Sequence, residues 1–133
     1  MLKLSKKVDY AIILLIHLGK SGNPVSAQEI AGMYQLPGPM IANILKQLAS
    51  NQMIQSRRGQ QGGYLLNKLP EEITLVDVIQ SIDGNFNLVE CADDGGCRIS
   101  GNCPTKGPLA ALHNQLKQFM ETITLASMIQ QQY

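Results

Sequence analysis

The chain has 133 residues, of which 44% are hydrophobic and none is tryptophan, so length and composition fit one folded domain with an aliphatic core. Its apolar run near the N-terminus, residues 11–16, is closed by His17 and Lys20 and is too short to span a bilayer. Three cysteines, an odd number, cannot all pair within the chain. We therefore expect a cytoplasmic protein with reduced thiols, no membrane association and no signal peptide.

The net charge of +1 conceals opposite charges in the two halves of the chain. Residues 1–69 carry eight basic and two acidic side chains, a net of +6, whereas residues 70–133 carry three basic and eight acidic ones, a net of −5. A basic front half favours a polyanion partner there, although a short chain can show such an imbalance by chance.

Two helices are predicted first. Ser5 can cap a helix over residues 6–18, which Gly19 and the 21–24 turn cluster would end. The apolar residues of this helix cover most of its circumference, so we expect it to be buried. Ser26 and Glu29 form a capping-box pattern at the start of a second helix, 27–34.

A third helix is predicted over residues 39–50, with Pro39 in its first turn after the 36–39 turn. Four apolar residues of this helix should point inward: Ile41, Ile44, Leu45 and Leu48. Four others should lie on or near its outer face: Met40, Asn43, Lys46 and Gln47. Two helices joined by a short turn, the second one polar outside, indicate a helix-turn-helix.

A hairpin is predicted next, from short strands over residues 53–56 and 64–67. Its glycine-rich tip, 57–63, carries Arg57 and Arg58, as in a DNA-binding wing; a solvated turn is the alternative. The glycines are not a phosphate-binding P-loop, because no Gly-Lys-Ser/Thr ends the run.

The second half of the chain should hold a helix over residues 74–82, capped by Thr74, then a loop over 83–106 and a further helix from Pro108 onward. That last helix carries apolar residues at heptad spacing: Leu109, Leu112, Leu116, Phe119 and Ile123. Such a seam favours a homodimer, with packing against its own domain as the alternative. Residues 124–128 can add a capped turn.

The predicted fold is thus mainly α with a small β-hairpin: a winged helix-turn-helix domain (1–82), a cysteine-bearing loop (83–106), and a long C-terminal dimerisation helix with its tail (107–133).

The three cysteines stand at equal spacing, Cys91, Cys97 and Cys103, in a stretch rich in glycine and aspartate. No CxxC pair is present, which disfavours a structural zinc site. Three thiolates on a wide loop suit an iron–sulfur cluster whose fourth ligand is not cysteine. The alternative, three solitary structural cysteines, would more often have apolar surroundings.

Four motifs together resemble the IscR/NsrR family of winged-helix repressors, over essentially the whole chain. They are Leu4-Ser5-Lys6-x-x-Asp9-Tyr10-Ala11, Arg58-Gly59-x-x-Gly62-Gly63-Tyr64, Ile73-x-x-x-Asp77-Val78-Ile79 and the spaced cysteines. Within the family, the chain is most similar to the proteobacterial regulators of the SUF iron–sulfur assembly operon.

The resemblance implies a dimer on a double-stranded, pseudo-palindromic DNA operator, with the third helix in the major groove and the wing in the minor groove. By position, the base-reading segment is matched by Pro39, Met40 and Asn43, and the wing arginine by Arg58. Phosphate contacts would come from Lys6, Lys7, Lys46 and Arg57. Ala42 departs from the acidic residue that IscR itself uses to discriminate operator classes.

The resemblance also implies a bound iron–sulfur cluster, with 2Fe-2S favoured over 4Fe-4S. Lys106 stands where IscR has its histidine ligand, so we expect Asp9 of the partner subunit as fourth ligand, as in NsrR-type members. His113 is the rival, although a lone histidine on the seam helix is more often a surface or interface residue. His17, at the end of the first helix, is interpreted as a structural residue, and Glu90, next to Cys91, stays open as a ligand.

The function that follows is transcriptional regulation, as a repressor of iron–sulfur assembly genes that senses cluster status. Two alternatives stay open: a nitric-oxide or redox sensor on the same scaffold, and a small iron–sulfur carrier protein. No nucleophile–base pair or paired carboxylates suggest an enzyme or a small-molecule substrate.

Overall fold

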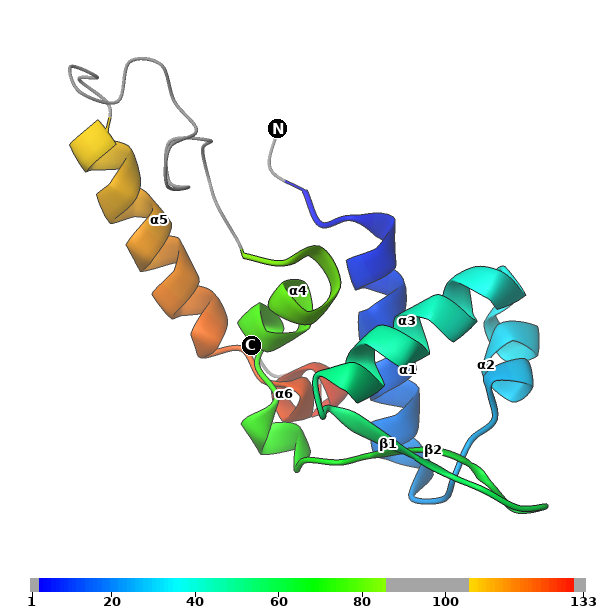
Figure 1. Ribbon diagram of the computed structural model, residues 1–133. Helices are drawn as coiled ribbons and strands as arrows, with labels where there is room; N and C mark the ends of the chain where they lie inside the picture. The colour runs from blue at the N-terminus through cyan, green and yellow to red at the C-terminus, as the bar shows by residue number, and fades with distance from the viewer. Residues whose placement is uncertain (1–2, 86–105, 131–133) are drawn as a thin grey trace.

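The computed structural model describes residues 3–85 and 106–130. Helices and strands follow in the order α1 (Lys6–Ser21), α2 (Ala27–Tyr34), α3 (Gly38–Ser50), β1 (Ile54–Arg57), β2 (Gly63–Leu66), the 3-10 turn η1 (Pro70–Glu72), α4 (Leu75–Asp83), α5 (Lys106–Glu121) and α6 (Leu125–Gln130) (Figure 1). The predicted fold class is confirmed: mainly helical, with one antiparallel hairpin following a helix-turn-helix.

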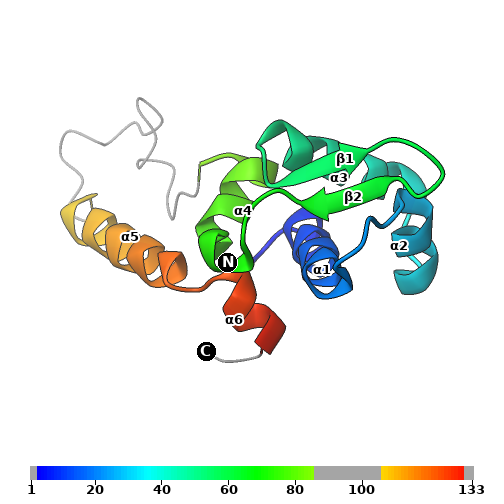
Figure 2. The ribbon, with the colours of Figure 1, turned by 90° about the horizontal axis from the view of Figure 1, so that it is seen from below.

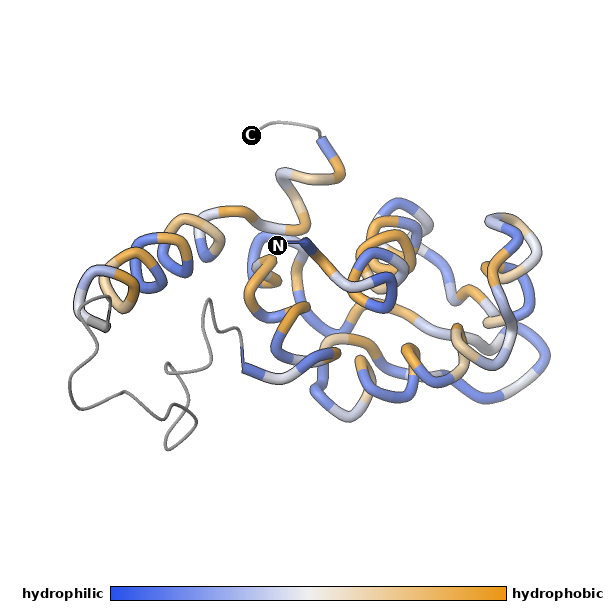
Figure 3. Tube along the Cα trace, turned by 90° about the horizontal axis from the view of Figure 1, so that it is seen from above, coloured by the Kyte–Doolittle hydropathy of each residue, from blue (hydrophilic) through white to orange (hydrophobic). Residues whose placement is uncertain are grey.

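The core is built around α1, against which α3, α4, α6 and β2 pack. Val8, Leu14 and Leu15 of α1 are fully buried, as predicted for a central helix. The four predicted inward residues of α3 are also fully buried, because positions three and four apart share one helical face. Figure 3 shows hydrophobic residues gathered where these helices meet.

Helix α1 ends three residues later than predicted, at Ser21, with Gly22 in the left-handed conformation (φ 72°) as its cap. Gly19 serves packing rather than termination. A Cβ added to it would lie 2.6 Å from Cδ1 of Ile129 in α6, so the missing side chain lets α6 approach α1.

The hairpin pairs β1 and β2 from Ile54–Leu66 to Arg57–Gly63, each strand displaced by one residue from its predicted bounds. Val25, between α1 and α2, adds a bridge to Tyr64: its N–H donates to the Tyr64 carbonyl (3.1 Å) and its own carbonyl accepts from Tyr64 (2.8 Å). The wing is therefore held to the loop that precedes the helix-turn-helix.

Helix α5 projects away from the body of the domain (Figures 1 and 2). It ends at Glu121, so the predicted seam was wrong in placing Ile123 on this helix; the chain turns there and continues into α6. Leu125 of α6 is fully buried against the core. None of the helices in residues 3–85 and 106–130 combines the length and apolarity needed to cross a membrane.

Candidate nucleic-acid interface

One face of α3 is exposed and carries side chains that can contact DNA. Pro39, Asn43 and Lys46 are exposed and Met40 is half-buried, while the opposite face is fixed in the core. Asn43 lies one turn from Pro39, and Lys46 three residues further, so these side chains share one side of the helix. A rigid, anchored helix presenting an amide, a cation and small apolar groups fits the major groove of DNA.

Gln47 departs from the prediction that it lies on or near this outer face. It is half-buried, and its Nε2 donates to the carbonyl of Ile82 at 3.4 Å because α4 packs against this side of α3. Its buried Oε1 has no hydrogen-bond partner within the described residues.

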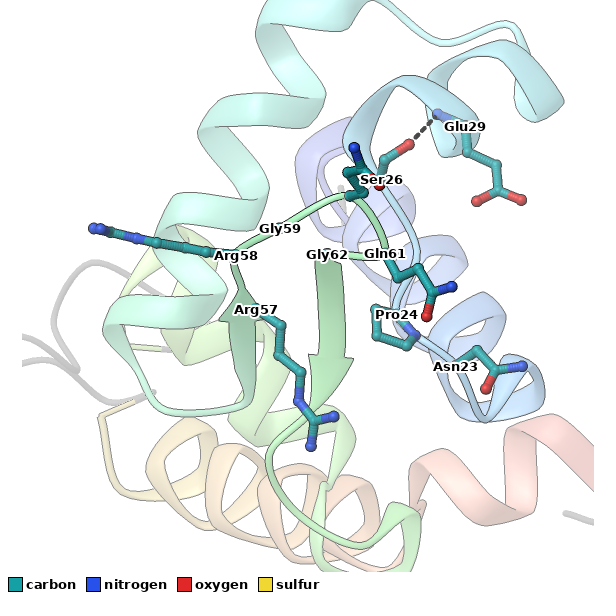
Figure 4. A pocket seen from close by; sticks show the side chains of 10 residues that line it. Asn23, Pro24, Ser26, Glu29, Arg57, Arg58, Gly59, Gln61 and Gly62 are labelled. Carbon is teal, nitrogen blue, oxygen red and sulfur yellow. Dashed lines mark hydrogen bonds between the residues drawn. The ribbon is translucent and has the colours of Figure 1, made fainter.

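The wing exposes Arg57 and Arg58 at the end of β1. Their side chains diverge, Arg58 reaching toward α3 and Arg57 pointing away from it (Figure 4). Arg57 is the last residue of β1, whereas Arg58 is the first residue of the tip that follows the strand. The tip is closed by the Gly62 N–H, which donates to the Gly59 carbonyl at 3.0 Å. The two arginines can thus serve different parts of a nucleic-acid backbone.

A groove runs between the wing and the N-terminal end of α2 (Figure 4). Its lining residues are polar, glycine or proline: Asn23, Pro24, Ser26, Glu29, Arg57, Arg58, Gly59, Gln60, Gln61 and Gly62. The Ser26 hydroxyl accepts from the Glu29 amide at 3.1 Å, while the Glu29 carboxylate points away from Ser26. This groove was not predicted from the sequence, because it depends on the contact between Val25 and the hairpin.

Lys6 and Lys7 lie in the first turn of α1, where Lys6 is exposed and Lys7 half-buried. Asp9, the expected partner-subunit ligand, is exposed in the same turn. The Ser5 hydroxyl begins the helix here by accepting from the Val8 amide at 3.2 Å. The Asp9 carboxylate therefore lies on the surface of this turn.

Cys91, Cys97 and Cys103 lie outside the described residues, as does Glu90. Within the part of the chain that the structure describes, no group of three or more His, Cys, Asp or Glu side chains is arranged to hold a metal ion. The C-terminal end of α4 and the start of α5, which flank the cysteines, lie in the upper part of Figure 1, as does the start of α1.

The two histidines considered as ligands occupy helices. The His17 Nδ1 lies 3.0 Å from the Tyr34 hydroxyl, and the two rings meet edge to face with centroids 5.6 Å apart. His17 therefore joins α1 to α2, which agrees with its interpretation as a structural residue. His113 lies half-buried on α5.

Residues 4–131 match the model of the Rrf2 family, described as an iron-dependent transcriptional regulator. The HTH-type transcriptional regulator IscR of Escherichia coli O1:K1 is 28% identical, over 98% of this chain and 82% of its own length.

Among solved structures, CymR, the global cysteine regulator of B. subtilis, superposes with a TM-score of 0.82 at 27% identity, covering 98% of both chains. T. potens IscR superposes with a TM-score of 0.77 at 25% identity, covering 99% of this chain and 89% of that one.

Proposed function

This chain belongs to the Rrf2 family of transcriptional regulators, and from that membership we propose that it represses iron–sulfur cluster assembly genes and senses cluster status through a cluster of its own. The observation that carries the DNA-binding part is the exposed polar face of α3 beside a wing with two arginines. DNA-binding regulation is what its relatives do; the gene class and the signal are the proposed part.

The proposed operator complex places α3 in the major groove and the wing in the minor groove. Asn43 can form two hydrogen bonds with an adenine edge, and Pro39 and Met40 supply apolar contacts beside it. Arg58 enters the minor groove, where a narrow A·T-rich stretch concentrates negative potential. Lys6, Lys7, Lys46 and Arg57 contact phosphates and set the register of the protein on the duplex.

The proposed cofactor is an iron–sulfur cluster, 2Fe-2S in preference to 4Fe-4S, held by Cys91, Cys97 and Cys103. The donor set fits: three thiolates are soft ligands for iron, and the exposed Asp9 carboxylate of a second copy can supply the fourth. Whether the protein holds a cluster would depend on the supply of iron and sulfide and on the presence of oxidants. Helices α4 and α5 flank the cysteines, so they would transmit the effect of cluster binding to the rest of the chain.

The proposed assembly is a cytoplasmic homodimer through α5. Leu112 and Phe119 of this helix are 46% and 61% exposed, an apolar surface that pairing with a second α5 would cover. A dimer also matches a two-fold symmetric operator, since each protomer then reads one half-site.

Nitric-oxide or redox sensing remains the second candidate, because thiolates with an exchangeable fourth ligand react with either signal. CymR, which has a similar fold, is described as the global cysteine regulator of B. subtilis, a role other than iron–sulfur regulation. A small iron–sulfur carrier protein is the third candidate, and it would show no sequence-specific retention of DNA.

The test compares the wild-type protein with the triple variant C91A/C97A/C103A, both purified without oxygen; Ser100→Ala, in the same segment, is the matched control. We expect the wild type and the control to contain iron and sulfide and to absorb visible light, and the triple variant to lose all three properties. Wild-type protein should also change its affinity for its operator when a chelator removes iron. Iron retained by the triple variant would refute the ligand assignment. A response to nitric oxide but not to iron removal would favour the second candidate.

A further inference from the structure

The last turn of α4 is tied to α3 by polar contacts as well as by packing. The Gln47 Nε2 donates to the Ile82 carbonyl at 3.4 Å. One residue earlier in α4, the Ser81 hydroxyl lies 3.6 Å from the sulfur of Met53, whose own N–H donates to Leu48 of α3. Two consecutive residues of α4 therefore each contact α3 or the residues just after it.

The Gln47 contact has a specific physical role at this helix end. The last four carbonyls of a helix have no partner inside it, and Ile82 is the second-to-last residue of α4. A carbonyl oxygen can only accept a hydrogen bond, so Nε2 of the Gln47 amide, and not Oε1, must face the Ile82 carbonyl. Its Oε1 is then left buried without a partner within the described residues, an arrangement that costs stability.

Gln47 thus keeps a buried oxygen that lowers stability, while its amide nitrogen caps another helix. This combination suggests that Gln47 has a role other than stabilising the fold. On α3, Gln47 lies one turn beyond Asn43 and directly after Lys46, the side chains proposed to contact DNA. On α4, Ile82 is three residues before Asn85, which is the last described residue before the cysteine segment.

We propose that Gln47 is a positioning residue: through the Ile82 carbonyl, it couples the end of α4 to the orientation of α3, and thereby to the affinity for DNA. This inference rests on the proposed function, because it names the route by which the cysteine segment would change operator affinity. A displacement of the last turn of α4 moves the carbonyl that Gln47 holds, and the helix that carries Asn43 turns with it.

The test uses Gln47→Met, which keeps the length of the side chain but cannot donate, and Gln80→Met as matched control, since Gln80 is an exposed glutamine on α4. The probe is a fluorescent duplex selected from a random pool by the wild-type protein. The affinity of the protein for this duplex is measured in two states, with anaerobic cluster-loaded protein and with protein stripped of iron. The wild type and Gln80→Met should show the same ratio of the two affinities, within the range of about 5- to 150-fold typical of allosteric coupling.

Gln47→Met should reduce that ratio at least ~3-fold, with unchanged iron content and visible spectrum. A ratio equal to that of the wild type would overturn the inference, while leaving the proposed function intact. If the wild type binds no cluster, the proposed function fails instead. The inference about Gln47 is then tested separately by amide hydrogen exchange. Amides of residues 82–85 and of α3 should then exchange faster in Gln47→Met than in Gln80→Met, and equal rates would overturn it.

Discussion

Thr74 and Thr124, fifty positions apart, face each other in an antiparallel bridge, and each also caps the helix that follows it. The bridge consists of Leu75 N–H donating to the Ile123 carbonyl (2.9 Å) and Leu125 N–H donating to the Ile73 carbonyl (2.8 Å). The Thr74 hydroxyl accepts from the Asp77 amide (3.1 Å), and the Thr124 hydroxyl accepts from the Ser127 amide (3.1 Å). The starts of α4 and α6 are therefore fixed side by side.

Replacing Thr74 by alanine should destabilise the fold, because the Asp77 amide loses its acceptor and the capping box is broken. We expect a loss of about 1–2 kcal/mol in the free energy of unfolding, measured by urea denaturation. Thr74→Ser keeps the hydroxyl and should stay close to the wild type. Equal stability of the alanine and serine variants would contradict this role of the cap.

Gly63→Ala should be strongly destabilising. Gly63 has φ 153°, and a Cβ there would lie 2.6 Å from the carbonyl carbon and oxygen of Val25, backbone atoms that cannot rotate away. We expect a loss of more than about 2 kcal/mol, by thermal or urea unfolding. Gly38→Ala, where a Cβ meets open space and φ is ordinary, should change stability by less than about 1 kcal/mol. Similar losses at both positions would show that the close approach of Val25 is not the cause.

Asn43→Ala should reduce discrimination between operator sequences, since the exposed amide is the proposed adenine reader. We expect a loss of about 1–3 kcal/mol of preference at one base pair, measured by fluorescence anisotropy on duplexes varied at each position. Lys46→Ala should instead weaken binding equally on all duplexes. It should also reduce the slope of log affinity against log salt concentration by about one. An unchanged preference in Asn43→Ala would remove this residue from base reading.

Arg58→Ala should weaken operator binding about 10-fold and reduce the preference for A·T-rich flanking sequence, because a guanidinium suits a narrow minor groove. Arg57→Ala should weaken binding without altering that preference, since its side chain points the other way. Lys20→Ala, an exposed cation at the far end of α1, serves as control for general loss of charge. If all three variants behave alike, the wing has no specific role.

Phe119→Glu should weaken the proposed dimer at least ~10-fold, because it places a charge in the apolar surface of α5. The oligomeric state is measured by sedimentation over a range of protein concentrations. Met33→Glu is the matched control: Met33 is 57% exposed on α2, outside the proposed interface. A dimer that persists in Phe119→Glu and dissociates in Met33→Glu would place the interface on α2 instead.

The sequence predicted best where structure depends on near neighbours. The spacing of Ile41, Ile44 and Leu48 determined the buried face of α3, and the hydroxyls of Ser5 and Thr74 marked helix starts that the structure confirms. These features follow from helical periodicity and from hydrogen bonds three residues apart, both readable in a short window.

Features that depend on distant contacts could not be predicted in this way. Gln47 looked like a surface residue because nothing near it in sequence indicates that α4 covers that side of α3. The bridge between Val25 and Tyr64 leaves no periodic pattern in either segment. Gly19 resembled a helix terminator, whereas the reason for glycine lies in Ile129, more than a hundred residues away. The ligand assignments for Cys91, Cys97 and Cys103 stay predictions.

The wing is stiff at its base and short at its tip, and this determines the entropic cost of binding DNA. The ladder from Ile54–Leu66 to Arg57–Gly63, with the Val25 bridge beside it, already fixes the strands in the free protein. The exposed tip, residues 58–61, lies outside this ladder, and ordering one fully free backbone costs about 1–2 kcal/mol. The paired strands therefore add little to this cost, and operator binding should require little folding of the wing beyond its tip.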